Sequence, residues 1–136
     1  MFDVGVANYL TKKTIEMLRG ADAGAAFEHY ILMELIAYKN LNKKRFDIRY
    51  WRTKTGLEVD FILGDGEVAI EVKISRQVEK QDFKGLIAFC EEHLPKAAYV
   101  ISQDARTRLI EIDEHIKITV LPWKIFIEQL WDGKIF

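Results

Sequence analysis

The stretch that decides the fold is Leu57-Glu58-Val59-Asp60-Phe61-Ile62-Leu63-Gly64-Asp65-Gly66-Glu67-Val68-Ala69-Ile70-Glu71-Val72-Lys73. Apolar residues recur at every second position on both sides of Gly64-Asp65-Gly66, which is typical of two strands joined by a tight turn. If Asp65-Gly66 forms a two-residue type I′ turn, one face of this hairpin is entirely apolar. That face pairs Leu57 with Ile74, Val59 with Val72, Phe61 with Ile70, and Leu63 with Val68. A slip of one residue would destroy this face, so the pattern fixes the register.

The same register puts Asp60 opposite Glu71 on the second face of the hairpin. Directly opposed Cβ atoms lie about 5 Å apart, where like charges are destabilising. A divalent metal would compensate, because hard cations bind carboxylate oxygens. Lys73 lies two residues beyond Glu71, on the same face and about 7 Å along the strand.

The alternative is that Asp60 and Glu71 are solvated surface residues, with Lys73 as their counter-charge. Helical patterns precede and follow the hairpin, so both faces of the sheet are expected to be covered. Carboxylates in a covered sheet need a partner, because burying an unpaired charge is costly. This argument favours a functional site over a solvated surface.

A third acid comes from the helical pattern between Asp22 and Leu41. At 100° per residue, Glu28 shares its side of this helix with small and apolar residues and is expected to point inward. These neighbours are Gly24, Ala25, Ile31, Leu32 and Leu35. Glu34 lies about 120° away on the helical wheel and is expected to be a solvent or boundary charge. The alternative for Glu28 is a position at the edge of the helix, with its carboxylate in water.

The remaining pattern predicts an α/β fold, with a mixed sheet of the α+β kind and helices packed on it. Residues 1–136 are expected to form one domain, with an N-terminal extension at 1–20 and a core at 21–136. The expected elements in the core are a helix at 22–41, strands at 46–53, 57–63 and 67–75, a helix at 79–93, strands at 97–102, 109–112 and 116–121, and a C-terminal helix after Pro122. Their order begins α-β-β-β-α-β.

Composition excludes several classes of protein. Of the 136 residues, 49% are hydrophobic and 30% are charged, which excludes a disordered chain. No apolar run reaches the roughly 18 residues of a membrane-spanning helix, so no membrane partner is expected. The single cysteine, Cys90, excludes an internal disulfide and indicates a reducing, cytoplasmic location. No Gly-x-x-x-x-Gly-Lys-Ser/Thr motif occurs, which excludes a P-loop NTPase.

The net charge of −1 conceals a basic segment at residues 39–54. This segment carries seven basic residues and one acid, a charge of +6, which leaves −7 for the rest of the chain. Such a segment predicts a surface that contacts nucleic-acid phosphates; a solvated helix end and edge strand is an equally weighted alternative. The predicted phosphate-binding residues are Lys43, Lys44, Arg45, Arg49, Arg52 and Lys54.

A helix Glu, a strand Asp and a Glu-x-Lys on the next strand resemble the PD-(D/E)XK nuclease superfamily. Here these residues are Glu28, Asp60 and Glu71-Val72-Lys73. More narrowly, the chain resembles the nuclease-like C-terminal domain of many prokaryotic AAA-type P-loop ATPases. The runs that carry this narrower resemblance are Phe2-Asp3-Val4-Gly5, Gly24-Ala25-Ala26-Phe27-Glu28, Tyr50-Trp51-Arg52, Gly56-Leu57-Glu58-Val59-Asp60-Phe61 and Ile70-Glu71-Val72-Lys73.

The resemblance implies a restriction-endonuclease-like core and catalytic residues Glu28, Asp60, Glu71 and Lys73. Asp60, Glu71 and the Val72 carbonyl would hold Mg²⁺ or Mn²⁺, and Glu28 would bind the metal through water or hold a second ion. Lys73 would either activate the attacking water or stabilise the transition state as a cation.

Two functions remain open from the sequence. The first is a metal-dependent nuclease that hydrolyses phosphodiester bonds, in DNA rather than RNA. The second is a non-catalytic nuclease-fold module that binds nucleic acid or protein for an ATPase domain, attached in cis or recruited in trans. The sequence does not distinguish a monomer from a homo-oligomer.

Overall fold

A computed structural model describes residues 21–136 of the chain. The expected N-terminal extension at 1–20, with its Phe2–Gly5 run, lies outside the described residues. The chain divides into two compact units, residues 1–45 and 46–136, and each is described by itself.

The described part of the first unit is helix α2, Ala21–Leu41. Its buried residues recur at a spacing of three or four along the whole helix, which is typical of an amphipathic helix with one covered face. They are Ala23, Phe27, Tyr30, Ile31, Glu34, Leu35 and Tyr38. The helix ends where the Asn42 amide donates to the Tyr38 carbonyl and Lys43 adopts a φ of 52°.

The second unit is built on a six-stranded mixed sheet with the strand order β1-β2-β3-β4-β6-β5. The strands are β1 Ile48–Arg52, β2 Glu58–Leu63, β3 Val68–Val72, β4 Ala97–Ser102, β5 Arg108–Glu111 and β6 Lys117–Pro122. The β1–β2, β2–β3 and β5–β6 pairs are antiparallel, whereas β3, β4 and β6 run parallel. A mixed α/β fold with helices packed on its sheet is therefore confirmed.

Between β3 and β4 the chain crosses over through a 3₁₀ turn, η1 (Lys80–Phe83), and helix α3 (Lys84–His93). Phe83, Leu86 and Phe89 from this segment are buried together with residues from one face of β2, β3, β4 and β6, and we call this set the α3 cluster. Its strand members are Val59, Ile62, Ala69, Ala98, Val100, Ile118 and Val120. Gly85 allows the close approach, because a Cβ at this position would overlap the backbone carbonyl of Glu58. One face of the sheet is thus covered by α3.

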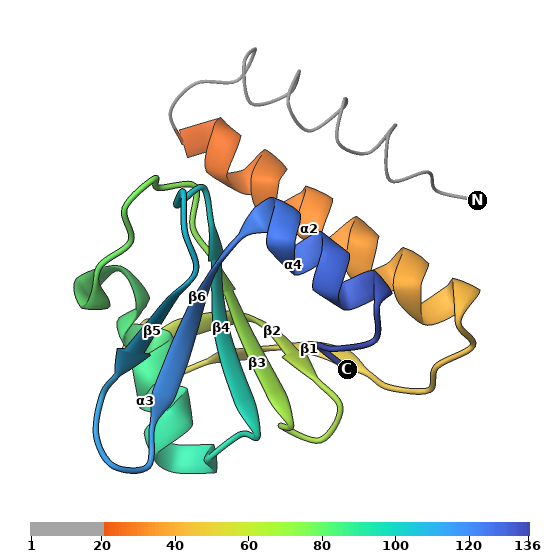
Figure 1. The fold of residues 1–136 in the computed structure, drawn as a ribbon. Helices are drawn as coiled ribbons and strands as arrows, with labels where there is room; N and C mark the ends of the chain where they lie inside the picture. The colour runs from red at the N-terminus through yellow and green to blue at the C-terminus, as the bar shows by residue number, and fades with distance from the viewer. Residues whose placement is uncertain (1–20) are drawn as a thin grey trace. The chain divides into compact units, whose positions relative to one another are not determined.

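Strand β6 leads directly into the C-terminal helix α4, Trp123–Trp131, as Figure 1 shows. The buried residues of α4 are Phe126, Ile127 and Leu130, and none of them belongs to the α3 cluster. Helix α4 contacts β4 and β6. Within residues 21–136, no helix is long and apolar enough to cross a membrane.

The parallel strands bring their carboxyl ends to one edge of the sheet. These ends are Val72 of β3, Ser102 of β4 and Pro122 of β6. Ligands bind at this edge in many open α/β sheets, because the loops that follow the strands gather there. The Glu71–Lys73 run lies at this carboxyl edge.

Candidate functional site

The β2–β3 hairpin has the register that the sequence predicts. Phe61 pairs with Ile70, Ile62 with Ala69, and Leu63 with Val68. The turn type is different from the prediction: the positive φ values belong to Gly64 and Gly66, and the Glu67 amide donates to the Leu63 carbonyl at 3.2 Å. A type I′ turn needs positive φ at Asp65 as well. The predicted two-residue loop and the observed longer loop are both centred on the Asp65–Gly66 bond, so the pairing of the two strands is the same in each.

A β-bulge at Asp60 interrupts the pairing of β2 with β1. Arg49 of β1 pairs with Ile62, but Trp51, two residues later, pairs with Val59. Asp60 and Phe61 therefore lie opposite the single residue Tyr50. Such bulges re-aim a side chain and end local strand pairing, and they are over-represented next to active sites.

The carboxylate of Asp60 replaces the backbone of β2 as a hydrogen-bond acceptor. Its Oδ2 accepts the Val72 amide at 2.8 Å, while the next amide along β3, that of Lys73, donates to Ile101 of β4 at 2.9 Å. The β2–β3 backbone pairs end at Phe61–Ile70. Asp60 is thus bonded to the peptide that links Glu71 to Val72, at the point where the two strands separate.

Glu71 is buried, with 5% of its surface exposed. It pairs with Val100 of β4 and lies two residues after Ala69 in β3. Val100 and Ala69 both belong to the α3 cluster. Side chains alternate along a strand, so Glu71 lies on the α3 side of the sheet. Lys73 follows directly after β3 and is partly buried. The direct cross-strand position of Asp60 and Glu71 stays a prediction.

The helix acids differ from the sequence interpretation. Glu34, expected at the solvent or the boundary, is fully buried and accepts a hydrogen bond from the Tyr30 hydroxyl at 3.2 Å. Glu28 is only partly buried, and its expected inward neighbour Ala25 is exposed. The buried stripe runs through Phe27, Tyr30 and Tyr38, aromatic residues that the sequence interpretation left out. Glu34 lies at the centre of that stripe, since it is seven residues after Phe27 and four before Tyr38.

Glu28 and Glu34 both belong to α2, in the unit that is described by itself. The part of Glu28 in a metal site therefore stays a prediction, and Glu34 becomes a second acid of interest on the same helix. Aromatic residues at i, i+3 and i+11, which are Phe27, Tyr30 and Tyr38, are the signal in the sequence that indicates the buried face.

The donor set at the end of β3 fits a magnesium ion better than a zinc ion. No group of three or more His, Cys, Asp or Glu residues within 21–136 could enclose a metal. Mg²⁺, however, is usually held by one or two carboxylates, waters and substrate phosphates rather than by a complete protein cage. Two carboxylates on neighbouring strands and the Val72 carbonyl would supply such a partial set.

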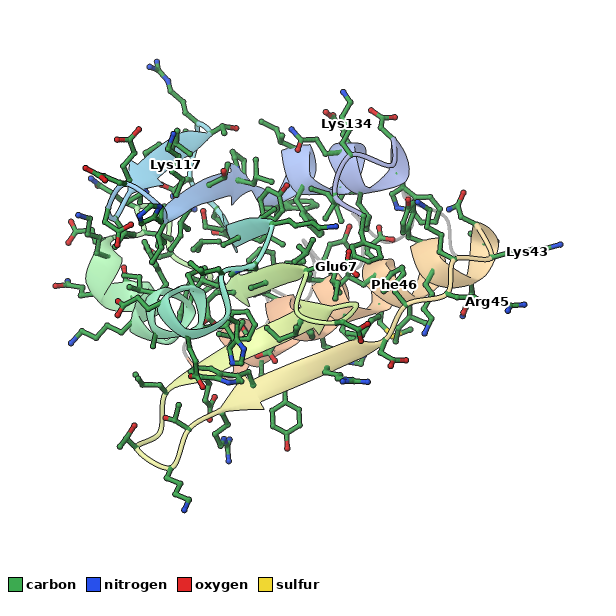
Figure 2. All side chains as sticks on the ribbon, turned by 90° about the horizontal axis from the view of Figure 1, so that it is seen from below. Lys43, Arg45, Phe46, Glu67, Lys117 and Lys134 are labelled. Carbon is green, nitrogen blue, oxygen red and sulfur yellow. The ribbon has the colours of Figure 1, made fainter. Side chains whose placement is uncertain are left out.

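The predicted phosphate-binding residues are all exposed. Figure 2 shows the side chains of Lys43 and Arg45 extending away from the ribbon. In β1, Arg49 pairs with Asp47 at 2.8 Å, and Arg52 pairs with Glu58 of β2 at 2.5 Å. Both pairs are largely exposed, so they leave the guanidinium groups accessible and contribute little to stability.

Two aromatic residues of β1 have opposite environments. Trp51 is partly buried and lies edge-on to Phe89 with ring centroids 5.4 Å apart. Tyr50, opposite the bulge, is 75% exposed. Tyr50 is therefore the aromatic ring of this strand that is accessible to a ligand.

A buried network of hydrogen bonds and one ion pair around Asp104 holds the loops at the carboxyl edge together. The sequence analysis did not predict it. Asp104, after β4, accepts hydrogen bonds from Ser102 Oγ and from the Val78 amide, and pairs with Arg108 at 2.7 Å. Arg108 also donates to the Val78 carbonyl at 2.6 Å. The loops that follow β3 and β4 are thus joined to each other and to β5. Ser-x-Asp directly after a buried strand is the local signal that could have indicated this turn.

One family matches the chain. The sequence profile of the family described as "Domain of unknown function (DUF4143)" matches residues 23–126, which include α2, the hairpin, α3 and the first residues of α4. No curated protein and no solved structure matches. The profile covers most of the chain and contains Asp60, Glu71 and Lys73, so the chain belongs to the DUF4143 family.

Proposed function

We propose that this chain is a cytoplasmic, divalent-metal-dependent nuclease domain that hydrolyses phosphodiester bonds in DNA. The single observation that carries the proposal is the hydrogen bond from the Val72 amide to Asp60 at the end of β3. It holds one carboxylate beside the Glu71–Val72 peptide, just beyond the last β2–β3 backbone pair, Phe61–Ile70.

The residues at the carboxyl edge have separate roles in this proposal. Asp60, Glu71 and the Val72 carbonyl would hold Mg²⁺ or Mn²⁺. The metal would polarise the scissile phosphate and stabilise charge on the attacking and leaving oxygens. Because the Val72 amide occupies Asp60 Oδ2, Oδ1 is the oxygen of this side chain that is available to a metal. In an extended strand the N–H and C=O of one residue face the same neighbour, so the Val72 carbonyl is expected on the β2 side as well.

Lys73 would act on the attacking water or on the phosphate. It lies two residues after Glu71, so an extended chain places both side chains on one side of β3. Its ammonium would orient or deprotonate the water, or stabilise the charge that develops on the phosphate. A Lys73→Met variant distinguishes a functional role from a structural one, since Met keeps the aliphatic length without the charge.

DNA would be held by the basic segment through its phosphates. Arg49, Arg52 and Lys54 belong to β1 and the turn after it, and Tyr50 presents an exposed ring between them. Phosphate contacts supply affinity without sequence information, and an aromatic ring can stack on any base. This surface favours a nuclease without strong sequence preference.

The resemblance to C-terminal domains of AAA-type ATPases supports a role beside such an ATPase, in cis or in trans. A non-catalytic module that binds nucleic acid or protein for the ATPase is the competing function. The two functions differ in one respect that can be measured: only a nuclease loses activity when the metal-binding carboxylates are neutralised.

The test is cleavage of supercoiled plasmid with Mg²⁺ or Mn²⁺, and with EDTA. We expect cleavage that EDTA abolishes, and a loss of at least 100-fold in Asp60→Asn and Glu71→Gln, since removing a group that stabilises transition-state charge typically costs 10²–10³-fold. Asp65→Asn is the matched control, because Asp65 is an exposed carboxylate in the turn of the same hairpin. A wild-type protein that cleaves nothing, or variants that cleave as well as Asp65→Asn, would contradict the proposal.

A further inference from the structure

A pocket of about 410 Å³ opens at the carboxyl edge, beside the loop that follows Lys73. It is formed by the segments that follow β3, β4 and β6. The residues that line it are Arg76, Gln103, Asp104, Ala105, Pro122, Trp123, Lys124 and Ile125. All of them belong to the second unit of the chain.

The pocket is cationic. Its one carboxylate, Asp104, is already neutralised by Arg108 and is bonded to Ser102 and the Val78 amide. Arg76 and Lys124 are exposed, and no acid among residues 21–136 forms an ion pair with either. Lys124 Nζ lies 5.6 Å from the centre of the Trp123 ring. Two uncompensated cations on one concave surface favour an anion as the occupant.

The position of the pocket relates it to the proposed catalytic residues. Arg76 follows Lys73 by three residues, so one loop joins the end of β3 to the pocket wall. Neighbouring strands lie about 4.8 Å apart, which places the end of β6 about 10 Å from the end of β3. Consecutive phosphates on one DNA strand are separated by more than the axial rise of about 3.4 Å, so that distance corresponds to one or two nucleotides.

We propose that this pocket binds a backbone phosphate of the DNA substrate, one or two nucleotides from the scissile phosphate. The substrate strand would then cross the carboxyl ends of β3, β4 and β6 in turn. This inference rests on the proposed nuclease function and adds to it the path of the substrate strand. It assigns phosphate contacts to Arg76 and Lys124, two cations outside the basic segment 39–54.

A second pocket provides a contrast within the same sheet. It is lined by Cys90, Leu94, Pro95, Lys96, Ala97, Ala98, His115, Ile116 and Lys117, at the amino ends of β4 and β6. It also presents two lysines, but Lys96 lies 3.4 Å from the Glu67 carboxylate. Lys117, which lines this pocket, and Glu67, which pairs with Lys96, are labelled in Figure 2. Since β4 and β6 separate this pocket from the carboxyl edge, it is not expected to contact a substrate bound there.

The experiment compares Arg76→Gln/Lys124→Gln with the matched control Lys96→Gln/Lys117→Gln. Each variant loses two charges from a pocket of the same sheet, and a thermal melt shows whether it is folded. Binding of a fluorescein-labelled DNA duplex is measured by anisotropy at several salt concentrations, with EDTA to prevent cleavage. We expect the slope of log K against log salt to fall by about 1.8 in the first variant, since each phosphate contact contributes about 0.9. We expect no change in the control.

The outcomes separate this inference from the proposed function. An unchanged slope in Arg76→Gln/Lys124→Gln, with wild-type binding and cleavage intact, would overturn the phosphate pocket and leave the nuclease proposal standing. Equal losses in both variants would also overturn it, because they indicate a general effect of charge. A wild-type protein that is stabilised by inorganic phosphate but binds no DNA would assign the pocket to a free anion and overturn both proposals.

Discussion

At the scale of single residues, the hydrogen bond between Asp60 and the Val72 amide connects structure to function. The aspartate at this position accepts the Val72 amide in place of a backbone carbonyl of β2, because the backbone pairs between β2 and β3 end at Phe61–Ile70. Asparagine can accept the same hydrogen bond through its amide oxygen, but it carries no charge. This difference separates a metal ligand from a structural acceptor.

We therefore predict that Asp60→Asn keeps the melting temperature of the metal-free protein, or raises it through reduced repulsion with Glu71. The rise in melting temperature on adding Mn²⁺ is expected to be lost, because a ligand stabilises only in proportion to RT ln(1 + [L]/Kd). Thermal melts of both proteins with and without Mn²⁺ measure this. A variant that melts lower under both conditions would identify Asp60 as a structural charge, paired with Lys73.

The buried thiol of Cys90 leads to a second prediction, on how the free energy of unfolding depends on pH. Burial, with a smaller contribution from Glu91, raises the pKa of its thiol from 9.0 to about 11. Above pH 9 the unfolded chain would lose this proton while the folded chain keeps it, so the unfolded state gains stability as pH rises. The contribution of Cys90 is complete below pH 9 and is lost as pH rises to about 11.

We expect the free energy of unfolding to fall by about 2 kcal/mol more in the wild type than in Cys90→Ala across this range. Urea denaturation of both proteins below pH 9 and near pH 11 tests this. Burial also raises the pKa of Tyr99, which contributes in the same direction in both proteins and cancels in the comparison. Parallel pH profiles for the two proteins would show that the thiol is not responsible.

At the scale of secondary-structure elements, the contact between α3 and β2 depends on Gly85. A Cβ at this position would overlap the carbonyl oxygen of Glu58, which is backbone and cannot rotate away. The start of α3 would have to shift from the sheet, together with Phe83 and Leu86 of the core. Since β2 carries Asp60, such a shift also reaches the candidate site.

We predict that Gly85→Ala lowers the free energy of unfolding by at least about 3 kcal/mol, as expected for severe overpacking. Gly24→Ala is the matched control in α2, since nothing lies within 4 Å of an added Cβ there. That change is expected to stabilise the protein by about 0.5–1 kcal/mol, because alanine is the better helix former. Urea denaturation of both variants compares them, and a stable Gly85→Ala protein would contradict the close approach of α3.

At the scale of the whole sheet, the crossover connections decide which residues gather at the carboxyl edge. Because β3, β4 and β6 are parallel, the segments that start at Lys73, Gln103 and Trp123 lie at the same edge. These segments are far apart in the sequence. The proposed catalytic residues and the proposed phosphate pocket are neighbours only because of this topology.

The sequence by itself determined the features with a strict local period. The hairpin register from Phe61–Ile70 to Leu63–Val68 is one, since side chains alternate and the apolar pattern favours a single pairing. The prediction is wrong for Val59, which was expected on the face of Phe61 but is buried with Ile62 and Ala69, because the bulge adds a residue to β2 between them. The strand at 97–102 was predicted with the bounds that the structure has, and the predicted helix at 79–93 corresponds to η1 and α3. These elements are defined by periodicity and by turn residues, which are local properties of the chain.

Only the tertiary structure decided which face of α2 is buried and how Asp60 is held. Glu34 is buried because of what covers that face of the helix. Apolar residues lie around most of the circumference of α2, so its sequence is compatible with more than one buried face. The bulge depends on β1, because it is defined by the one-residue offset between Arg49–Ile62 and Trp51–Val59. The Asp104 network likewise joins the loops that follow β3 and β4 to each other and to β5. Each of these features is a relation between segments distant in sequence, which a local pattern does not contain.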